Sequence, residues 1–123
     1  MAKLTYQVIQ KPIEERLIDA ACVYWEVERP YFSQKTQDTT VVYRKSVLYY
    51  LIKTACPHFT FENLAGKFGF LSHQPVMRAV EKIEAQKNIY KQTFNDINQI
   101  SHLADKLDAT FITTSIELIT NKQ

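Results

Sequence analysis

Gln74 and Arg78 are the residues whose types and spacing point most directly to chemistry. They lie four positions apart, about one helical turn, so both side chains face the same side of a helix. In the major groove of DNA, Gln can form two hydrogen bonds to adenine and Arg can form two to guanine. His73 and Ser72 lie at the N-terminal end of the same predicted helix, the end that approaches base edges, where His73 can donate to a base or a phosphate. This arrangement predicts direct contacts with DNA bases.

The same residues also allow a simpler interpretation. Glu81 follows Arg78 by three positions, and an ion pair at that spacing would stabilise an ordinary solvated helix by only about 0.2–0.5 kcal/mol. On a DNA-binding face, Glu81 would instead need to accept a hydrogen bond from a cytosine amino group. Both interpretations of this helix face stay open from the sequence.

Basic residues elsewhere in the chain predict contacts with phosphate groups that do not depend on the base sequence. The candidates are Lys67, Lys82, Arg44 and Lys45. The formal charge of the chain is +2, but residues 41–91 carry eight Lys or Arg against three Glu, a net charge of +5. The flanks are mildly acidic, with a net charge of −1 over residues 1–40 and −2 over residues 92–123. A basic centre suits a surface that meets phosphate, although solvated helix faces also produce such runs.

The sequence gives little support for nucleotide binding, metal binding or nucleophilic catalysis. The chain has two glycines, Gly66 and Gly69, too few for a phosphate-binding loop or a dinucleotide motif. Cys56 and His58 flank Pro57, but no second pair follows at zinc spacing and nothing marks them for nucleophilic catalysis. We therefore predict no metal, no cofactor, no nucleotide and no enzymatic activity. With no long apolar run and no signal peptide in the sequence, we predict a cytoplasmic protein that does not enter the membrane.

Helices must position these residues, because two Gly and four Pro supply few tight turns for a β fold. Apolar spacing predicts helices over 13–27, from Thr39 or Thr40 to the residue before Pro57, and over 60–68, 72–87 and 90–107, with a short helical turn at 31–35. Thr39 or Thr40, Thr60 and Ser72 are the expected N-caps. Phe94 should lie in the core, whereas Tyr43, Tyr49 and Tyr50 are the aromatic residues expected to stay exposed. Residues 1–12 are expected to form an arm and residues 108–123 a C-terminal extension, for which a short helix is favoured over a strand.

The segment around the glycines has the pattern of a helix-turn-helix unit. Gly69, Phe70 and Leu71 would form a three-residue turn between two helices, with Gly69 in a left-handed conformation. Gly66, one turn earlier, would permit close approach of a neighbouring helix.

The stretch 64–83 resembles the signature of domain IV, the TrpR-like C-terminal DNA-binding domain of the bacterial replication initiator DnaA. The positions that match are Phe68, Gly69, His73, Val76, Ala79, Lys82 and Ile83, and the resemblance extends over residues 13–107. It implies an all-α helix-turn-helix domain in which the helix 72–87 enters the major groove and His73 contacts a base. Gln74 and Pro75 stand where the family has two Thr, and residues 36–40 replace its Arg-rich loop.

We predict a stand-alone module that binds double-stranded DNA in replication or in transcription regulation. The alternative is a protein-interaction or scaffold domain that keeps this fold, has lost DNA binding and contacts a protein partner. Phe70, Leu71 or the C-terminal extension 108–123 would then form the interface.

Overall fold

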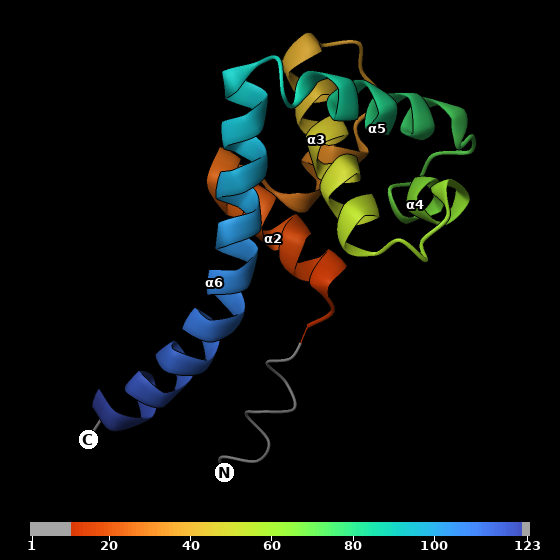
Figure 1. Ribbon diagram of the computed structural model, residues 1–123. Coiled ribbons are helices and arrows are strands. Elements are labelled where there is room, and N and C mark those ends of the chain that lie inside the picture. Colours follow the sequence, from red (N-terminus) through yellow and green to blue (C-terminus); the bar gives the residue numbers. More distant parts are fainter. Residues whose placement is uncertain (1–10, 122–123) are drawn as a thin grey trace.

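Helices form where the apolar spacing predicts them. The computed structural model describes the backbone of residues 11–121 and the side chains of residues 11–106, where the chain is a single all-α domain without strands. Its elements are α2 (Ile13–Trp25), the 3-10 helix η1 (Arg29–Ser33), α3 (Thr39–Ala55), α4 (Phe61–Lys67), α5 (Gln74–Gln86) and α6 (Lys91–Asn121) (Figure 1). Most of the predicted arm, residues 1–10, lies outside the described residues.

α3 is the central helix of the fold. It contacts α2, η1, α4, α5 and α6, and every residue from Lys45 to Ile52 is buried. Because neighbouring elements surround this helix, it has no solvent-exposed face, and its sequence therefore has no polar stripe that would identify one. The predicted exposure of Tyr49 and Tyr50 is therefore wrong, since both are buried in the core, and Tyr43 is half-buried.

The caps of α3 and α4 explain where these helices begin. Asp38, rather than Thr39 or Thr40, caps α3: its carboxylate accepts from the amides of Thr40 and Val41 at 3.0 and 3.2 Å. A carboxylate at this position is also favoured by the helix dipole. The prediction for Thr60 is confirmed, because its hydroxyl accepts from the amide of Asn63 in a capping box.

α6 is a single helix that packs against α2 and then extends beyond it (Figure 1). Within residues 91–106, Ile100 and Ala104 are its fully buried apolar residues, and the helix continues without a break to Asn121. The predicted end at residue 107, followed by a separate short helix, is wrong. The prediction for Phe94 is also wrong, since its side chain is 49% exposed. The inner face of this first turn of α6 is occupied by polar residues instead.

Asp96 is the centre of that polar inner face. Its side chain is 2% exposed, and its two carboxylate oxygens accept from the Tyr24 hydroxyl at 2.7 Å and the Tyr43 hydroxyl at 2.5 Å. Gln92 also donates to it, at 2.8 Å. Because Tyr24 lies on α2 and Tyr43 on α3, this buried carboxylate links three helices through hydrogen bonds.

The two phenols predict how stability responds to alkaline pH. The hydrogen bond to Asp96 raises the pKa of Tyr24 to about 12, and burial followed by the same kind of bond raises the pKa of Tyr43 to about 12. Unfolded tyrosine titrates near pH 10, so the unfolded chain releases these protons first. Their contribution to stability is complete below pH 10 and is lost as the pH rises from 10 to 12. We therefore expect the midpoint of urea unfolding to fall between pH 10 and 12 less steeply in Tyr43→Phe than in the parent protein. An equal fall of the midpoint with pH in both proteins would contradict the role given to the Tyr43 phenol.

The connection from α4 to α5 is longer than predicted, at six residues (68–73) instead of three. Gly69 has φ +80°, which confirms its predicted left-handed conformation. The amide of Phe70 donates to the carbonyl of Ala65 at 2.9 Å, and that of Gly69 donates to Gly66 at 3.1 Å, the two bonds of a Schellman motif. The predicted role of Gly66 in close helix packing is wrong, since nothing lies within 4 Å of where its Cβ would be.

These environments predict opposite effects of the same substitution at the two glycines. Gly66→Ala should stabilise the protein by about 0.5–1 kcal/mol, because it improves helix propensity without a clash. Gly69→Ala should destabilise it by about 1–2 kcal/mol, because an alanine Cβ is strained at positive φ. Urea denaturation of the two variants measures both effects, and a change of the same sign in both would contradict the prediction.

Candidate nucleic-acid interface

α5 divides sharply into a packed side and a free side. Val76 and Ile83 are each 1% exposed and pack with α3 in the core, while Gln74, Arg78 and Lys82 are exposed. No salt bridge among the described residues involves Arg78, Glu81 or Lys82. The i, i+3 ion pair between Arg78 and Glu81, on which the solvated-helix interpretation relied, is not formed. The structure therefore brings Gln74, Arg78 and Lys82 together with their polar groups free.

The N-terminal end of α5 differs from the prediction. The helix begins at Gln74, two residues after the predicted start, and Pro75 occupies its second position, where no intrahelical amide is needed. His73 is the N-cap residue and makes no side-chain capping bond, whereas the Ser72 hydroxyl accepts from the Gln74 amide at 3.3 Å. Ser72 is exposed and His73 is half-buried. Both lie at the N-terminal end of α5, next to Gln74 in the chain.

Lys67 and Arg44 have partners inside the protein. The ammonium group of Lys67 is hydrogen-bonded to Glu15 of α2, and this bond is the main cause that lowers the pKa of Glu15. The guanidinium of Arg44 lies 5.5 Å from the ring centroid of Trp25 and 5.8 Å from that of Tyr31, and it donates to the Tyr31 hydroxyl at 3.3 Å. Both cations are thus occupied in holding α3 and α4 against the α2–η1 region.

Lys45 is a correction to the predicted set of phosphate contacts. The residue is 8% exposed, and its Nζ donates to the backbone carbonyl of Gln34 at 2.6 Å. A buried ammonium group cannot reach the phosphate of a duplex that lies on the surface. From the sequence alone, a basic residue on a helix indicates a solvated face. Lys45 departs from this because neighbouring elements enclose α3.

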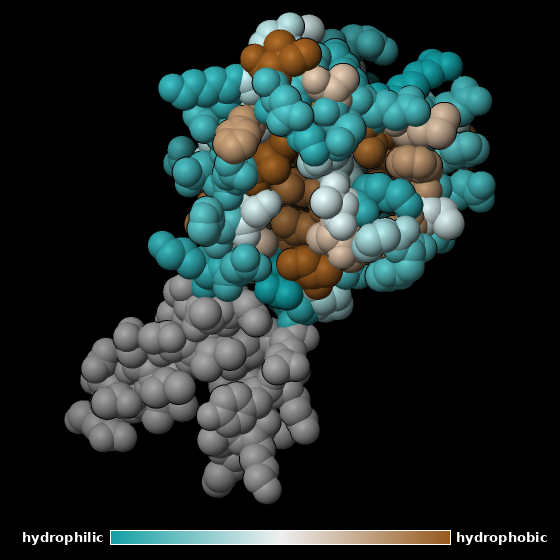
Figure 2. Space-filling view, in the orientation of Figure 1, coloured by the Kyte–Doolittle hydropathy of each residue, from teal (hydrophilic) through white to brown (hydrophobic). Residues whose placement is uncertain are grey.

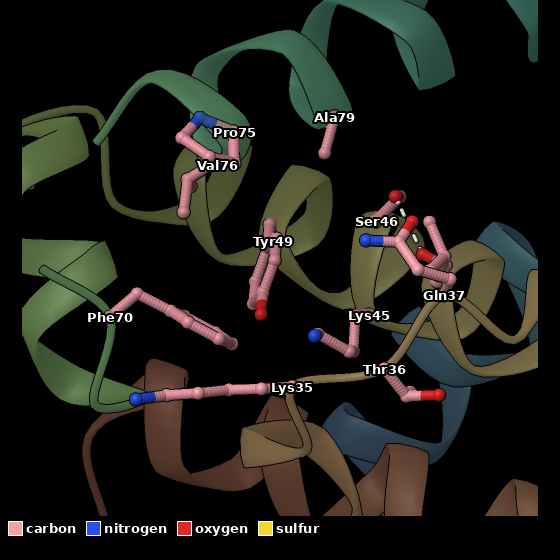
Figure 3. Close-up of a pocket in the computed structure, with 11 residues that line it drawn as sticks. Lys35, Thr36, Gln37, Lys45, Ser46, Tyr49, Phe70, Pro75, Val76 and Ala79 are labelled. Atoms are coloured by element: carbon pink, nitrogen blue, oxygen red, sulfur yellow. Dashed lines mark hydrogen bonds between the residues drawn. The ribbon is translucent and has the colours of Figure 1, made fainter. Parts of the chain in front are cut away.

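The loop 34–38 lies across a groove from α5. Two adjoining hollows of about 410 and 390 Å³ share Gln37, Val42 and Ser46 and together run between this loop, α3 and one edge of α5. We call this feature the loop–α5 groove. Lys35, labelled in Figure 3, lines it from the loop, and Lys82 lines it from α5, so an exposed cation lies on each side.

Sequence analysis missed Lys35. It lies just before residues 36–40, the stretch that stands in place of the family's Arg-rich loop, and it was assigned to the preceding helical turn. The structure ends η1 at Ser33, which leaves Lys35 in the loop itself. The polar run from Gln34 onward is the signal that would have placed it there.

Apolar groups are exposed at two other places. Leu71 is fully exposed in the α4–α5 connection, while Phe70 is half-buried against Tyr49, with 6.5 Å between ring centroids. Ile89, Tyr90 and Phe94 form a second exposed cluster where α5 leads into α6. Figure 2 shows, on the face that it draws, hydrophobic residues exposed among hydrophilic ones. The side chains of the extension 108–123 lie outside the described residues.

The surroundings of Cys56 do not favour its thiol as a nucleophile. Burial, followed by the nearby Glu14 carboxylate, raises the pKa of the Cys56 thiol, whereas a reactive cysteine needs a lowered one. Cys22 and Cys56 are both free. Among the described residues, no group of three His, Cys, Asp or Glu side chains is placed to hold a metal ion, and no helix is long and apolar enough to cross a membrane.

Comparison with protein-family models, with curated proteins and with solved structures found no match to this chain. Over the residues that the structure describes, the chain is an all-α domain of five α-helices with a polar face on α5 that makes no ion pair there. The resemblance to the DnaA domain depends on the residues of the sequence alone.

Proposed function

We propose that this chain is a module that binds double-stranded DNA through a helix-turn-helix similar to that of DnaA domain IV, with α4 as its first helix and α5 as its recognition helix. The observation that carries this proposal is the free face of α5, where Gln74, Arg78 and Lys82 are exposed and make no ion pair within the described residues. Such a module would serve as a replication-initiator-like protein or a transcription regulator.

The loop–α5 groove supports a specific way of docking. A helix in the major groove has a phosphate backbone on each side of it. With α5 in the groove, one backbone strand would lie over the loop–α5 groove, where Lys35 and Lys82 approach it from opposite banks. Gln74 and Arg78 would face the bases, and His73 and Ser72 would lie at the helix tip. The DNA contacts would thus come from α5 and the loop, without the buried Lys45.

Binding to a pool of random-sequence duplexes at two salt concentrations tests the proposal. If two or three cations contact phosphates, affinity should fall by about 10–40-fold between 50 and 200 mM salt. Selection of duplexes from the same pool then gives the preferred sequence. No binding at 50 mM salt, or binding that salt does not change, would overturn the proposal.

The exposed cluster of Ile89, Tyr90 and Phe94 favours a second candidate, a protein-interaction domain that pairs with another copy of the chain. The surfaces that the sequence indicated for such contacts are Phe70, Leu71 and the extension 108–123. Under this alternative, the sedimentation coefficient should rise with protein concentration in the parent protein but not in Phe94→Ser, and the duplex pool should not bind. Concentration-independent sedimentation would eliminate it.

A further inference from the structure

Lys45 has no anionic partner among the described residues although the residue is buried, at 8% exposure. Its Nζ makes one hydrogen bond, to the Gln34 carbonyl, and lies 4.5 Å from the ring centroid of Phe70. No carboxylate of the described residues lies within 4.0 Å of it. An ammonium group carries three donors, so hydrogen-bonding capacity is left over. Burial of an uncompensated charge is costly, and the ring of Phe70 offsets only part of that cost.

The space in front of this amino group suits a small molecule. It is the larger hollow of the loop–α5 groove, about 410 Å³, within the usual range for small-ligand sites. Figure 3 shows Lys45, Tyr49 and Phe70 converging on it from different elements, with Lys35 extended along its far side. Val76 and Ala79 of α5 close it from above in that view. Its walls are therefore mainly apolar, with the amino group of Lys45 inside the hollow and the Lys35 side chain along its edge.

We propose that this hollow binds a small, flat organic anion, an aromatic carboxylate, whose carboxylate meets the amino group of Lys45. The ring of the ligand would lie between Phe70 and Tyr49 on one side and Val76 and Ala79 on the other. A duplex phosphate cannot take this place, because Lys45 is 8% exposed at the base of the hollow. The proposal concerns a second ligand and does not depend on DNA binding.

Calorimetric titration with 2-naphthoate, compared with the neutral 2-naphthalenemethanol, tests the charge of the ligand. We expect the parent protein to bind 2-naphthoate at least tenfold more tightly, since the carboxylate gains charge-assisted hydrogen bonds that the alcohol cannot form. Lys45→Met keeps the length and apolar stem of the side chain and should remove this preference. Lys106→Met, at an exposed position on α6, is the matched control and should keep it. Equal binding of the two probes, or an unchanged preference in Lys45→Met, would overturn the proposal.

Amide chemical-shift mapping of the parent protein gives a result that does not depend on how a variant folds. Titration with 2-naphthoate in the absence of DNA should shift the amides of Phe70, Val76 and Ala79 most. Shifts centred elsewhere, or none at millimolar 2-naphthoate, would overturn the proposal. Because no DNA is present, failure here leaves the test of the DNA-binding function unaffected.

Discussion

Replacing Asp96 with alanine is expected to lower the free energy of unfolding by about 2–3 kcal/mol. The carboxylate is buried and accepts from Tyr24, Tyr43 and Gln92, and each hydrogen bond to a charged group contributes about 1.5–3 kcal/mol. The gain from no longer burying a charge offsets part of this sum. The phenol of Tyr43, on the central helix, would lose its strongest acceptor in a half-buried place. The loss therefore exceeds that of an ordinary surface substitution several-fold.

Urea denaturation of Asp96→Ala measures this effect. Asn95→Ala is the matched control, because Asn95 is the exposed neighbour of Asp96 on the same helix, and its removal reports helix propensity alone. A double-mutant cycle between Asp96→Ala and Tyr43→Phe should show coupling of at least about 1 kcal/mol. Equal stability of Asp96→Ala and Asn95→Ala, or no coupling in the cycle, would show that the three helices are held by apolar packing alone.

Local signals in the sequence were sufficient for much of the fold. The caps at Thr60 and Gly69 depend on interactions within a few residues, so the residue types alone identified them. Pro57 was expected to end α3, and the helix stops at Ala55. Asp38 was overlooked because three polar residues in a row can each cap a helix, and only the geometry selects one.

Features that depend on tertiary contacts were not predictable in this way. A helical wheel assigns one buried side to each helix, but α3 is enclosed by its neighbours, so Lys45 and Tyr50 were placed on the wrong side. Phe94 was assigned to the core for its apolar character, yet the neighbouring polar Asp96 takes the inner position because two tyrosines of other helices satisfy it. The candidate face on α5 was identified correctly as exposed, since α5 has neighbours on one side only.

Separate substitutions on α5 should give different changes in DNA binding, because the three free side chains are expected to contact different parts of the duplex. Arg78→Ala should weaken binding to the selected duplex by about 5–150-fold and relax the preference at one base position, as loss of a bidentate base contact does. Gln74→Ala should relax the preference at a neighbouring position. Lys82→Ala should weaken all duplexes alike and reduce the salt slope by about 1, since it removes one phosphate contact.

The control variants make this pattern decisive. Lys106→Ala removes an exposed cation on α6 and should leave both affinity and preference unchanged, which separates local contacts from net charge. Glu81→Gln removes the one acidic group beside Arg78 on α5, and because the structure shows no ion pair between them, it should strengthen binding without loss of stability. Fluorescence anisotropy with the selected and a scrambled duplex measures all five variants. If Gln74→Ala, Arg78→Ala and Lys82→Ala behave identically, α5 does not lie in the major groove with its N-terminal turns against the bases.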